Sequence, residues 1–356
     1  MTEENEDFLD EELLDSHDIG ADIDEESKGL YEHLNITVDS KQEPLRVDKF
    51  LTNFRQNSSR NKISQTCRAG NVVVNGIAVK QNYRVKPGDQ ISLLLAHPPR
   101  ENHIIPQNIP INIVYEDDDV VVVDKDPGMV VHPGFGNWDK TLVNALAYHF
   151  EKNGNKTDLD RVGLVHRIDK DTSGLLVIAK NEHALSFLAK QFFERKTKRL
   201  YWAFVWGNVK EDTGTITGHI GRHPKNRMQM HTYTDGSQGK HAVTHYSVLE
   251  RFRYMTWVEC KLETGRTHQI RAHFKHIGHT LFNDARYEGS TALRGVNMPK
   301  YKQFINNVFE ILPRHALHAH TLGFIHPTTK EEMYFESPMP EDMANAVKKW
   351  RNYLEN

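Results

Sequence analysis

The chain has very few cysteines and no long hydrophobic run. Only Cys67 and Cys260 occur among its 356 residues, and they lie far apart without a CxxC pattern. We therefore expect no disulfide framework but two buried structural thiols, which is typical of a reducing cytoplasm. No apolar run approaches the roughly 18 residues that a membrane-spanning helix needs. The acidic N-terminus also lacks the apolar segment of a signal peptide, so the sequence predicts a cytoplasmic protein without a membrane partner.

Large apolar side chains are scarce in residues 1–33 as well. Residues 1–40 contain 15 of the 48 acidic residues and one of the 45 basic residues. A segment of this composition cannot bury enough apolar surface to offset the entropy of ordering. We predict a disordered acidic tail over residues 1–33, which either solubilises the chain or competes electrostatically with a polyanion.

The rest of the chain has a surplus of positive charge. Residues 41–356 hold 33 acidic and 44 basic residues, a balance of +11 that the total charge of −3 conceals. A basic body is typical of proteins with a polyanionic partner, although many ordinary soluble domains share such a surplus.

Residues 34–105 have the pattern of a small α/β module followed by a linker. Apolar residues recur at helical spacing over residues 47–54, and a second short helix fits Asn61–Ala69, with a glycine after it. Apolar residues on both sides of Asn75-Gly76 predict a hairpin with a type I′ turn. The strand Gln90–Leu95 completes the module.

Residues 106–356 form a larger domain whose strand-like and helical stretches lack the regular spacing of βαβ units. Helices are expected at Thr141–Phe150 and His183–Lys190. This pattern predicts an α+β fold around a mixed, largely antiparallel sheet. The expected strands are Ile111–Tyr115, Val120–Asp124, Leu175–Ala179, Tyr201–Trp206 and Thr256–Leu262.

The segment Gly163–Lys180 places a charged loop between two apolar, strand-like runs. Catalytic groups often lie on loops that rigid strands anchor. In this loop Asp169 follows Arg167 by two residues, and an acid beside a guanidinium stays ionised. Such a carboxylate is able to act as a nucleophile or a base. The alternative is a loop with ordinary surface ion pairs.

A second polar segment, Glu263–Lys275, begins with a turn and continues as a predicted helix. Residues His268, Arg271 and Lys275 are spaced to share one polar face of that helix. We expect these groups either to bind phosphates or to pair with the carboxylate of Asp169.

The third segment, Lys198–Val205, is an expected strand that begins with two basic residues. Its alternation points Tyr201 inward. A tyrosine at such a position is either an ordinary core residue or part of a site.

The small module resembles the S4 RNA-binding domain over about residues 45–95. The resemblance rests on the opening Arg46–Asp48 and the turn Gly70–Gly76, which occur in the family's order. It implies that the basic second helix binds RNA phosphates. The basic residues of that segment are Arg60, Lys62 and Arg68.

The three segments of the larger domain together resemble the RluA family of pseudouridine synthases. The closest likeness is to the subgroup in which an N-terminal S4 domain accompanies action on large-subunit ribosomal RNA. The similarity runs over about residues 45–337 and includes Val131–Gly134, His241–Tyr246 and Leu317–Phe324. One departure is Ile168, where the family usually has leucine of similar volume.

The resemblance implies a role for several residues. Asp169 matches the essential catalytic aspartate, and Arg271 matches the arginine that pairs with it. Tyr201 matches the active-site tyrosine, which packs on the uracil and is a candidate base. Arg167 matches the residue that fills the space left by the extruded base. The remaining residues of the expected substrate pocket are His166, Arg266, His268 and Ile270.

The implied reaction breaks an N-glycosidic bond, turns the uracil and rejoins it through C5. Nothing is oxidised, so we expect no cofactor. The expected partner is large-subunit ribosomal RNA or an assembly intermediate, bound by a monomer. The alternative is a non-catalytic RNA-binding factor in ribosome assembly whose modification site has decayed.

The 21 histidines raise one more alternative, a zinc-dependent RNA hydrolase. Neither an HExxH pattern nor a cysteine pair is present, and no suitable carboxylate is obvious nearby. We therefore expect no metal ligands. The histidines that recur at close spacing are His273, His276 and His279, and then His315, His318 and His320.

Overall fold

The computed structural model describes residues 31–54, 60–95, 104–134, 137–154 and 163–355. The described residues form two compact units, one that ends by residue 103 and one that begins at Ile104. All but the last three positions of the predicted acidic tail lie outside the described residues. Within the described ranges, every helix is too short or too polar to cross a bilayer.

The small unit is a four-stranded antiparallel sheet with two helices, and its strand order is β1-β4-β2-β3. The two predicted helices, the hairpin and the strand that follows it are confirmed. The φ angles are 50° at Asn75 and 81° at Gly76, which agrees with the type I′ turn. The elements are β1 Tyr31–Thr37, α2 Val47–Phe54, α3 Arg60–Arg68, β2 Val72–Val74, β3 Ile77–Ala78 and β4 Gln90–Leu95.

Strand β1 is an element that the sequence pattern did not predict. It begins at Tyr31, so the last three residues of the segment expected to be disordered are a strand. β1 is an edge strand paired with β4, and its Leu34 and Ile36 are only partly buried against the core of the unit. An edge strand with two apolar contacts leaves too weak a hydrophobic pattern for prediction.

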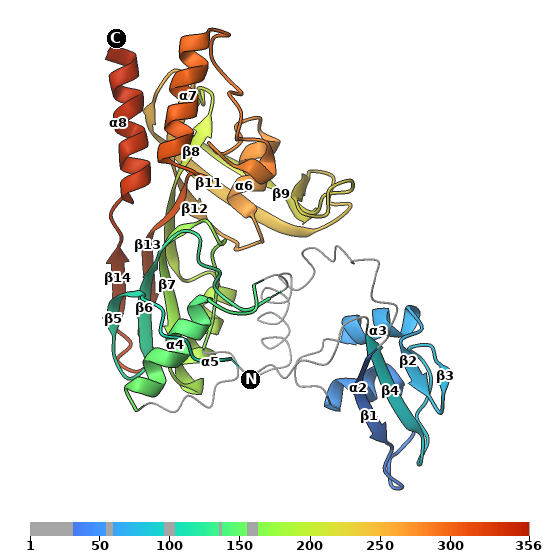
Figure 1. The fold of residues 1–356 in the computed structure, drawn as a ribbon. Coiled ribbons are helices and arrows are strands. Elements are labelled where there is room, and N and C mark those ends of the chain that lie inside the picture. Colours follow the sequence, from blue (N-terminus) through green and yellow to red (C-terminus); the bar gives the residue numbers. More distant parts are fainter. Residues whose placement is uncertain (1–30, 55–59, 96–103, 135–136, 155–162, 356) are drawn as a thin grey trace. The chain divides into compact units, whose positions relative to one another are not determined.

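A ten-stranded sheet runs through the large unit (Figure 1). Its order is β10-β9-β11-β12-β8-β13-β7-β6-β5, with β14 paired to β13. β7 and β13 are parallel, and the other described pairs are antiparallel, which confirms the predicted α+β fold. The strands are β5 Asn112–Glu116, β6 Val120–Lys125, β7 Ser173–Ala179, β8 Lys198–Trp206, β9 Thr213–Arg222, β10 Met230–Tyr233, β11 Lys240–Arg251, β12 Met255–Leu262, β13 Leu317–Ile325 and β14 Glu332–Glu336.

Helices cover both faces of this sheet. Alternate residues of β7 separate the two sides: Leu176 packs in the same core as α4, whereas Val177 packs in the core that contains α5. Helices α7 and α8 pack together over a third core, which contains Trp206 of β8. The described helices are α4 Leu142–Lys152, α5 Glu182–Phe193, α6 Gln269–His276, α7 Pro299–Ile311, α8 Glu341–Glu355 and the 3-10 turn η1 Ala285–Tyr287. The helices predicted at Thr141–Phe150 and His183–Lys190 are confirmed as α4 and α5, and the helix predicted within Glu263–Lys275 is α6.

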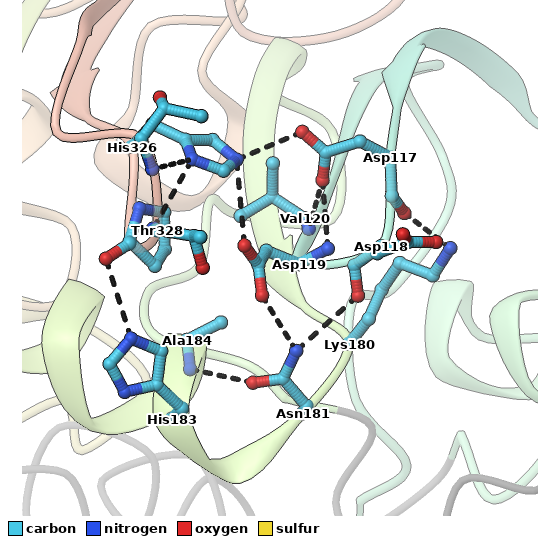
Figure 2. Close-up of polar contacts among 12 residues, drawn as sticks. Asp117, Asp118, Asp119, Val120, Lys180, Asn181, His183, Ala184, His326 and Thr328 are labelled. Carbon is cyan, nitrogen blue, oxygen red and sulfur yellow. Dashed lines mark hydrogen bonds and ion pairs between the residues drawn. The ribbon is translucent and has the colours of Figure 1, made fainter.

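A polar network fixes three connections at one edge of the fold (Figure 2). His326, at the end of β13, lies 2.9 Å from the carboxylate of Asp117 through Nε2, and its Nδ1 accepts the backbone N–H of Thr328 at 3.3 Å. Asn181 caps the start of α5 and also donates to Asp119 at 2.9 Å. The network therefore ties the β5–β6 turn to the β13–β14 connection and to α5.

Candidate active site

The loop that carries Asp169 is held between two strands. Leu164 forms an isolated bridge to Ile178, so the chain folds back on β7. The backbone N–H of Thr172 donates to the carbonyl of Asp169 at 3.1 Å and closes a turn. Gly174 has a φ of 111°, and a Cβ there would lie 2.3 Å from the carbonyl oxygen of Ala319. Only glycine allows β13 to approach this closely, and the approach positions the loop.

Arg271 lies on α6 between two carboxylates. Its Nη1 donates to Oδ2 of Asp169 at 2.7 Å. On the other side, Nε and Nη2 donate to the two carboxylate oxygens of Asp284 at 2.7 and 2.9 Å. The side chain of Arg271 is 6% exposed, and that of Asp169 is 21% exposed. Asp284 thus fixes the guanidinium bidentately, and the remaining nitrogen is directed at Asp169.

The charge state of Asp169 follows from its neighbours. Burial opposes ionisation, but the positive charge of Arg271, together with that of His268 when its ring is protonated at low pH, outweighs it and holds the pKa of this carboxyl well below its usual range. Burial also lowers the pKa of His268 to about 3, so its imidazole is neutral near pH 7. Arg271 is therefore the cation that keeps Asp169 ionised at that pH.

His268 precedes α6 in a left-handed conformation with a φ of 53°. Its Nδ1 lies 3.0 Å from the hydroxyl of Tyr287, and its Nε2 lies 4.0 Å from Asp169. Lys275, further along α6, donates to Glu288 at 2.5 Å. All three side chains contact Tyr287, so they lie on one side of the segment, as predicted: the guanidinium carbon of Arg271 is 4.9 Å from its ring centre, and Lys275 donates to its carbonyl oxygen at 3.3 Å. Of the three, Arg271 pairs with Asp169, whereas Lys275 pairs with Glu288.

A pocket that is open to solvent lies over Asp169 and Arg271. Tyr201 of β8 is buried and lines the pocket from the sheet. The structure thus brings together all the site residues predicted for the larger domain. The pocket residues shared with that prediction are His166, Arg167, Asp169, Tyr201, Arg266, His268, Ile270 and Arg271.

The predicted RNA-binding residues of the small unit belong to α3. Arg68 is exposed, and its Nε donates to Gln81 at 3.2 Å. The side chains of Arg60 and Lys62 lie outside the described residues. Their part in RNA binding stays a prediction.

Two buried cations hold the loop that carries Asp169 through its main chain, and the sequence analysis missed both. Lys125 of β6 donates to the carbonyl oxygens of Asp126, Met129 and Lys170 at 2.6, 2.9 and 2.9 Å. Burial lowers the pKa of Lys125 to about 7. Three carbonyl acceptors match the three N–H groups of its ammonium form.

Arg314 is the second of these cations. It donates to the carbonyl oxygen of Asp171 at 2.9 Å and forms a bidentate pair with Asp342 of α8 at 2.7 and 3.0 Å. The carbonyls of two successive loop residues, Lys170 and Asp171, are therefore bound from two different elements.

Two of the histidines that recur in the sequence contact hydroxyl groups of the loop that follows Asp169. His315 lies 2.9 Å from the hydroxyl of Thr172, and His318 lies 3.0 Å from that of Ser173. In the described part of the chain, no three His, Cys, Asp or Glu side chains form a group that could hold a metal ion. Cys67 and Cys260 are free and buried, as predicted.

Comparison with known proteins identifies the family. Residues 119–276 match the family model described as RNA pseudouridylate synthase, and residues 45–91 match that of the S4 domain. An uncharacterized RNA pseudouridine synthase of Chlorobaculum parvum is 46% identical over 324 residues, which are 90% of this chain and 98% of the relative. The chain therefore belongs to the RNA pseudouridine synthases. It is an RNA-modifying enzyme with an RNA-binding S4 domain.

Two further relatives and one solved structure are consistent with this assignment. An uncharacterized RNA pseudouridine synthase of Bacillus subtilis is 44% identical over 89% of this chain and 98% of its own length. A protein named ribosomal large subunit pseudouridine synthase D, from Xanthomonas campestris, is 38% identical over 85% and 88%. The structure of human RNA pseudouridylate synthase domain containing 4 shares the fold, with a TM-score of 0.52 and 21% identity over 67% of this chain and 93% of that one.

Proposed function

We propose that this enzyme converts uridines of large-subunit ribosomal RNA to pseudouridine, with Asp169 as the catalytic carboxylate and without a cofactor. The observation that carries the proposal is the ionised Asp169, paired with Arg271 at 2.7 Å in the wall of an open pocket. The names of relatives that are 38% identical over most of the chain support ribosomal RNA as the substrate.

The reaction moves one base without changing its oxidation state. The N1–C1′ bond breaks, the uracil turns, and a C5–C1′ bond forms as N1 gains a proton and C5 loses one. Asp169 either attacks the ribose or abstracts a ribose proton, and both steps need the carboxylate ionised. Arg271, which Asp284 holds in place, keeps the carboxylate of Asp169 ionised and fixes its orientation.

Tyr201 and Arg167 act on the flipped nucleotide. A base must leave its stack to reach the pocket, which costs a few kcal/mol. In our proposal Tyr201 offers a stacking face for the uracil and assists removal of the C5 proton, while Arg167 fills the space left in the RNA. A Tyr201→Phe variant with full turnover would remove the proton-transfer role and leave the stacking role intact.

The small unit supplies affinity through phosphate contacts of Arg60, Lys62 and Arg68, which makes binding dependent on salt. Deletion of residues 34–96 should therefore reduce capture of limiting RNA more than it reduces turnover at saturation. Because ribosomal RNA of bacterial relatives is a cytoplasmic substrate, we place the enzyme in the cytoplasm, acting as a monomer.

The experiment that tests the proposal measures tritium release from ribosomal RNA labelled at uridine C5. We expect release by the intact protein and none by Asp169→Asn. If naked RNA yields no release, the large-subunit assembly intermediate is the next substrate. If neither naked RNA nor the assembly intermediate releases tritium, the result would favour a non-catalytic assembly factor. An Asp169→Ala variant that loses RNA affinity rather than turnover would favour the same alternative.

A further inference from the structure

Arg199 is a pocket residue to which the reaction described above gives no task. It lies on β8 two residues before Tyr201, and alternate residues of a strand share one face. Both residues line the pocket together with Asp169. The neighbouring Lys198 points to the other side, where it pairs with Glu332 of β14.

An aromatic ring rather than a carboxylate holds Arg199 in place. Its guanidinium carbon lies 5.0 Å from the ring centre of Phe192, at the end of α5. That ring is stacked on His166, with centroids 4.5 Å apart and an interplanar angle of 22°. The cation is therefore positioned by its contact with a packed ring, and its Nε donor stays without a partner among the described residues.

The charge of Arg199 is uncompensated in the described part of the chain. No carboxylate there forms an ion pair with it, and its buried Nε has no hydrogen-bond partner. The other arginines of this region differ. Arg271 binds two carboxylates, and Arg314 binds Asp342. A half-buried guanidinium without an anion is costly, and a negatively charged group of the substrate would remove that cost.

We propose that Arg199 binds a backbone phosphate of the RNA next to the target uridine and so orients that nucleotide over Asp169. This inference rests on the proposed function. A phosphodiester is the recurring anion of the substrate, and its oxygens fit the fork of an arginine. Uracil is neutral and would leave the charge uncompensated.

The test compares Arg199→Gln with Lys198→Gln, which removes the same charge one residue away on the opposite face. Both are assayed by tritium release from C5-labelled ribosomal RNA over a range of salt concentrations. Loss of one charged hydrogen bond predicts a fall in kcat/KM of about tenfold to a hundredfold for Arg199→Gln. Loss of one phosphate contact should also make the slope of log(kcat/KM) against log[salt] shallower by about 0.7 to 0.9. Lys198→Gln should change neither.

Arg199→Lys is the second variant, for the case that Arg199→Gln has a lower midpoint of thermal unfolding than the wild type. It keeps the charge but loses the fork, so it should retain the salt slope with a smaller fall in kcat/KM. An unchanged kcat/KM in Arg199→Gln would overturn the proposal. So would a fall in kcat/KM with an unchanged salt slope, because that result indicates a contact with the uracil carbonyls.

The proposed function fails separately, when the wild type itself releases no tritium. The phosphate contact is then tested by the salt dependence of Kd for the same RNA. If log Kd depends on log[salt] with the same slope in Arg199→Gln and in the wild type, the phosphate contact is overturned. A shallower slope in Arg199→Gln would support the contact.

Discussion

Two clusters of the large unit place a histidine beside a carboxylate, and they differ in how completely protein groups satisfy them. In the network of Figure 2, both ring nitrogens of His326 are bonded, one to Asp117 and one to backbone N–H groups. In the pocket, Nε2 of His268 lies 4.0 Å from Asp169, beyond hydrogen-bond distance. Within the described residues, Oδ1 of Asp169 has no hydrogen-bond partner, while Oδ2 is bonded to Arg271.

The difference separates stability from catalysis. A cluster that is closed on itself contributes to folding, because each partner left alone would be a buried, unsatisfied polar group. A cluster whose ionised oxygen lies at a pocket and lacks a protein partner is able to react with or bind a substrate. Substitutions in the two clusters should therefore affect different measurements.

The largest effect is expected from Asp169→Asn. The amide cannot act as a nucleophile or base, so turnover should fall by at least about a thousandfold. Arg271 keeps its bidentate partner Asp284, so the midpoint of thermal unfolding should stay close to that of the wild type. Tritium release and thermal denaturation of the same preparation check both statements. A large loss of stability would place Asp169 with the structural cluster.

The next largest effect concerns the cation that holds the loop after Asp169. Lys125→Met removes the hydrogen bond to the carbonyl of Lys170. A misplacement of about 1 Å costs on the order of a hundredfold in rate, so kcat should fall by that factor while KM changes little.

Steady-state kinetics separate this positioning effect from a loss of RNA binding. Lys190→Met serves as the control, because this exposed lysine of α5 pairs only loosely with Glu194, at 3.8 Å. A Lys125→Met variant whose KM rises with kcat unchanged would contradict the positioning role.

A moderate effect is expected in the structural cluster. His326→Phe leaves the carboxylate of Asp117 and two backbone N–H groups without their partner. We expect the free energy of unfolding to fall by about 1 to 3 kcal/mol. Urea denaturation measures this loss, and kcat at 20 °C should match the wild type. A reduced kcat in the folded variant would show that the two clusters are coupled.

The effect that is smallest near neutral pH is a change in the pH dependence of stability. Burial lowers the pKa of His273 to about 4. The unfolded chain therefore binds a proton at this residue below about pH 6.5, and the folded chain does so only below about pH 4. The histidine thus lowers stability as the pH falls through that window, by up to about 1.4 kcal/mol per pH unit. Urea denaturation at several pH values should give a shallower slope for His273→Gln, and an identical slope would contradict the assignment.

Much of this arrangement was visible in the sequence. Strong local patterns, such as the apolar run of β7 and the Asn75-Gly76 turn, predicted their elements. The motif residues Asp169, Tyr201 and Arg271 were predicted to form one site, and they line one pocket. Their catalytic roles stay predictions until the variants are measured.

The missed features depend on contacts between distant segments. Asp284 is an ordinary loop acid in the sequence, and its importance appears only when η1 brings it to Arg271. Lys125 and Arg314 bind main-chain carbonyls, which leave no trace in side-chain patterns.

The bidentate pair of Arg314 with Asp342 also sets an order in time. Asp342 belongs to α8, which follows all of the pocket residues in the chain and is therefore synthesised after them. Until α8 has been synthesised and docked, Arg314 lacks its carboxylate and the loop lacks one of its two anchors. A nascent chain that already contains Asp169, Tyr201 and Arg271 therefore still lacks the carboxylate that holds Arg314 against the loop.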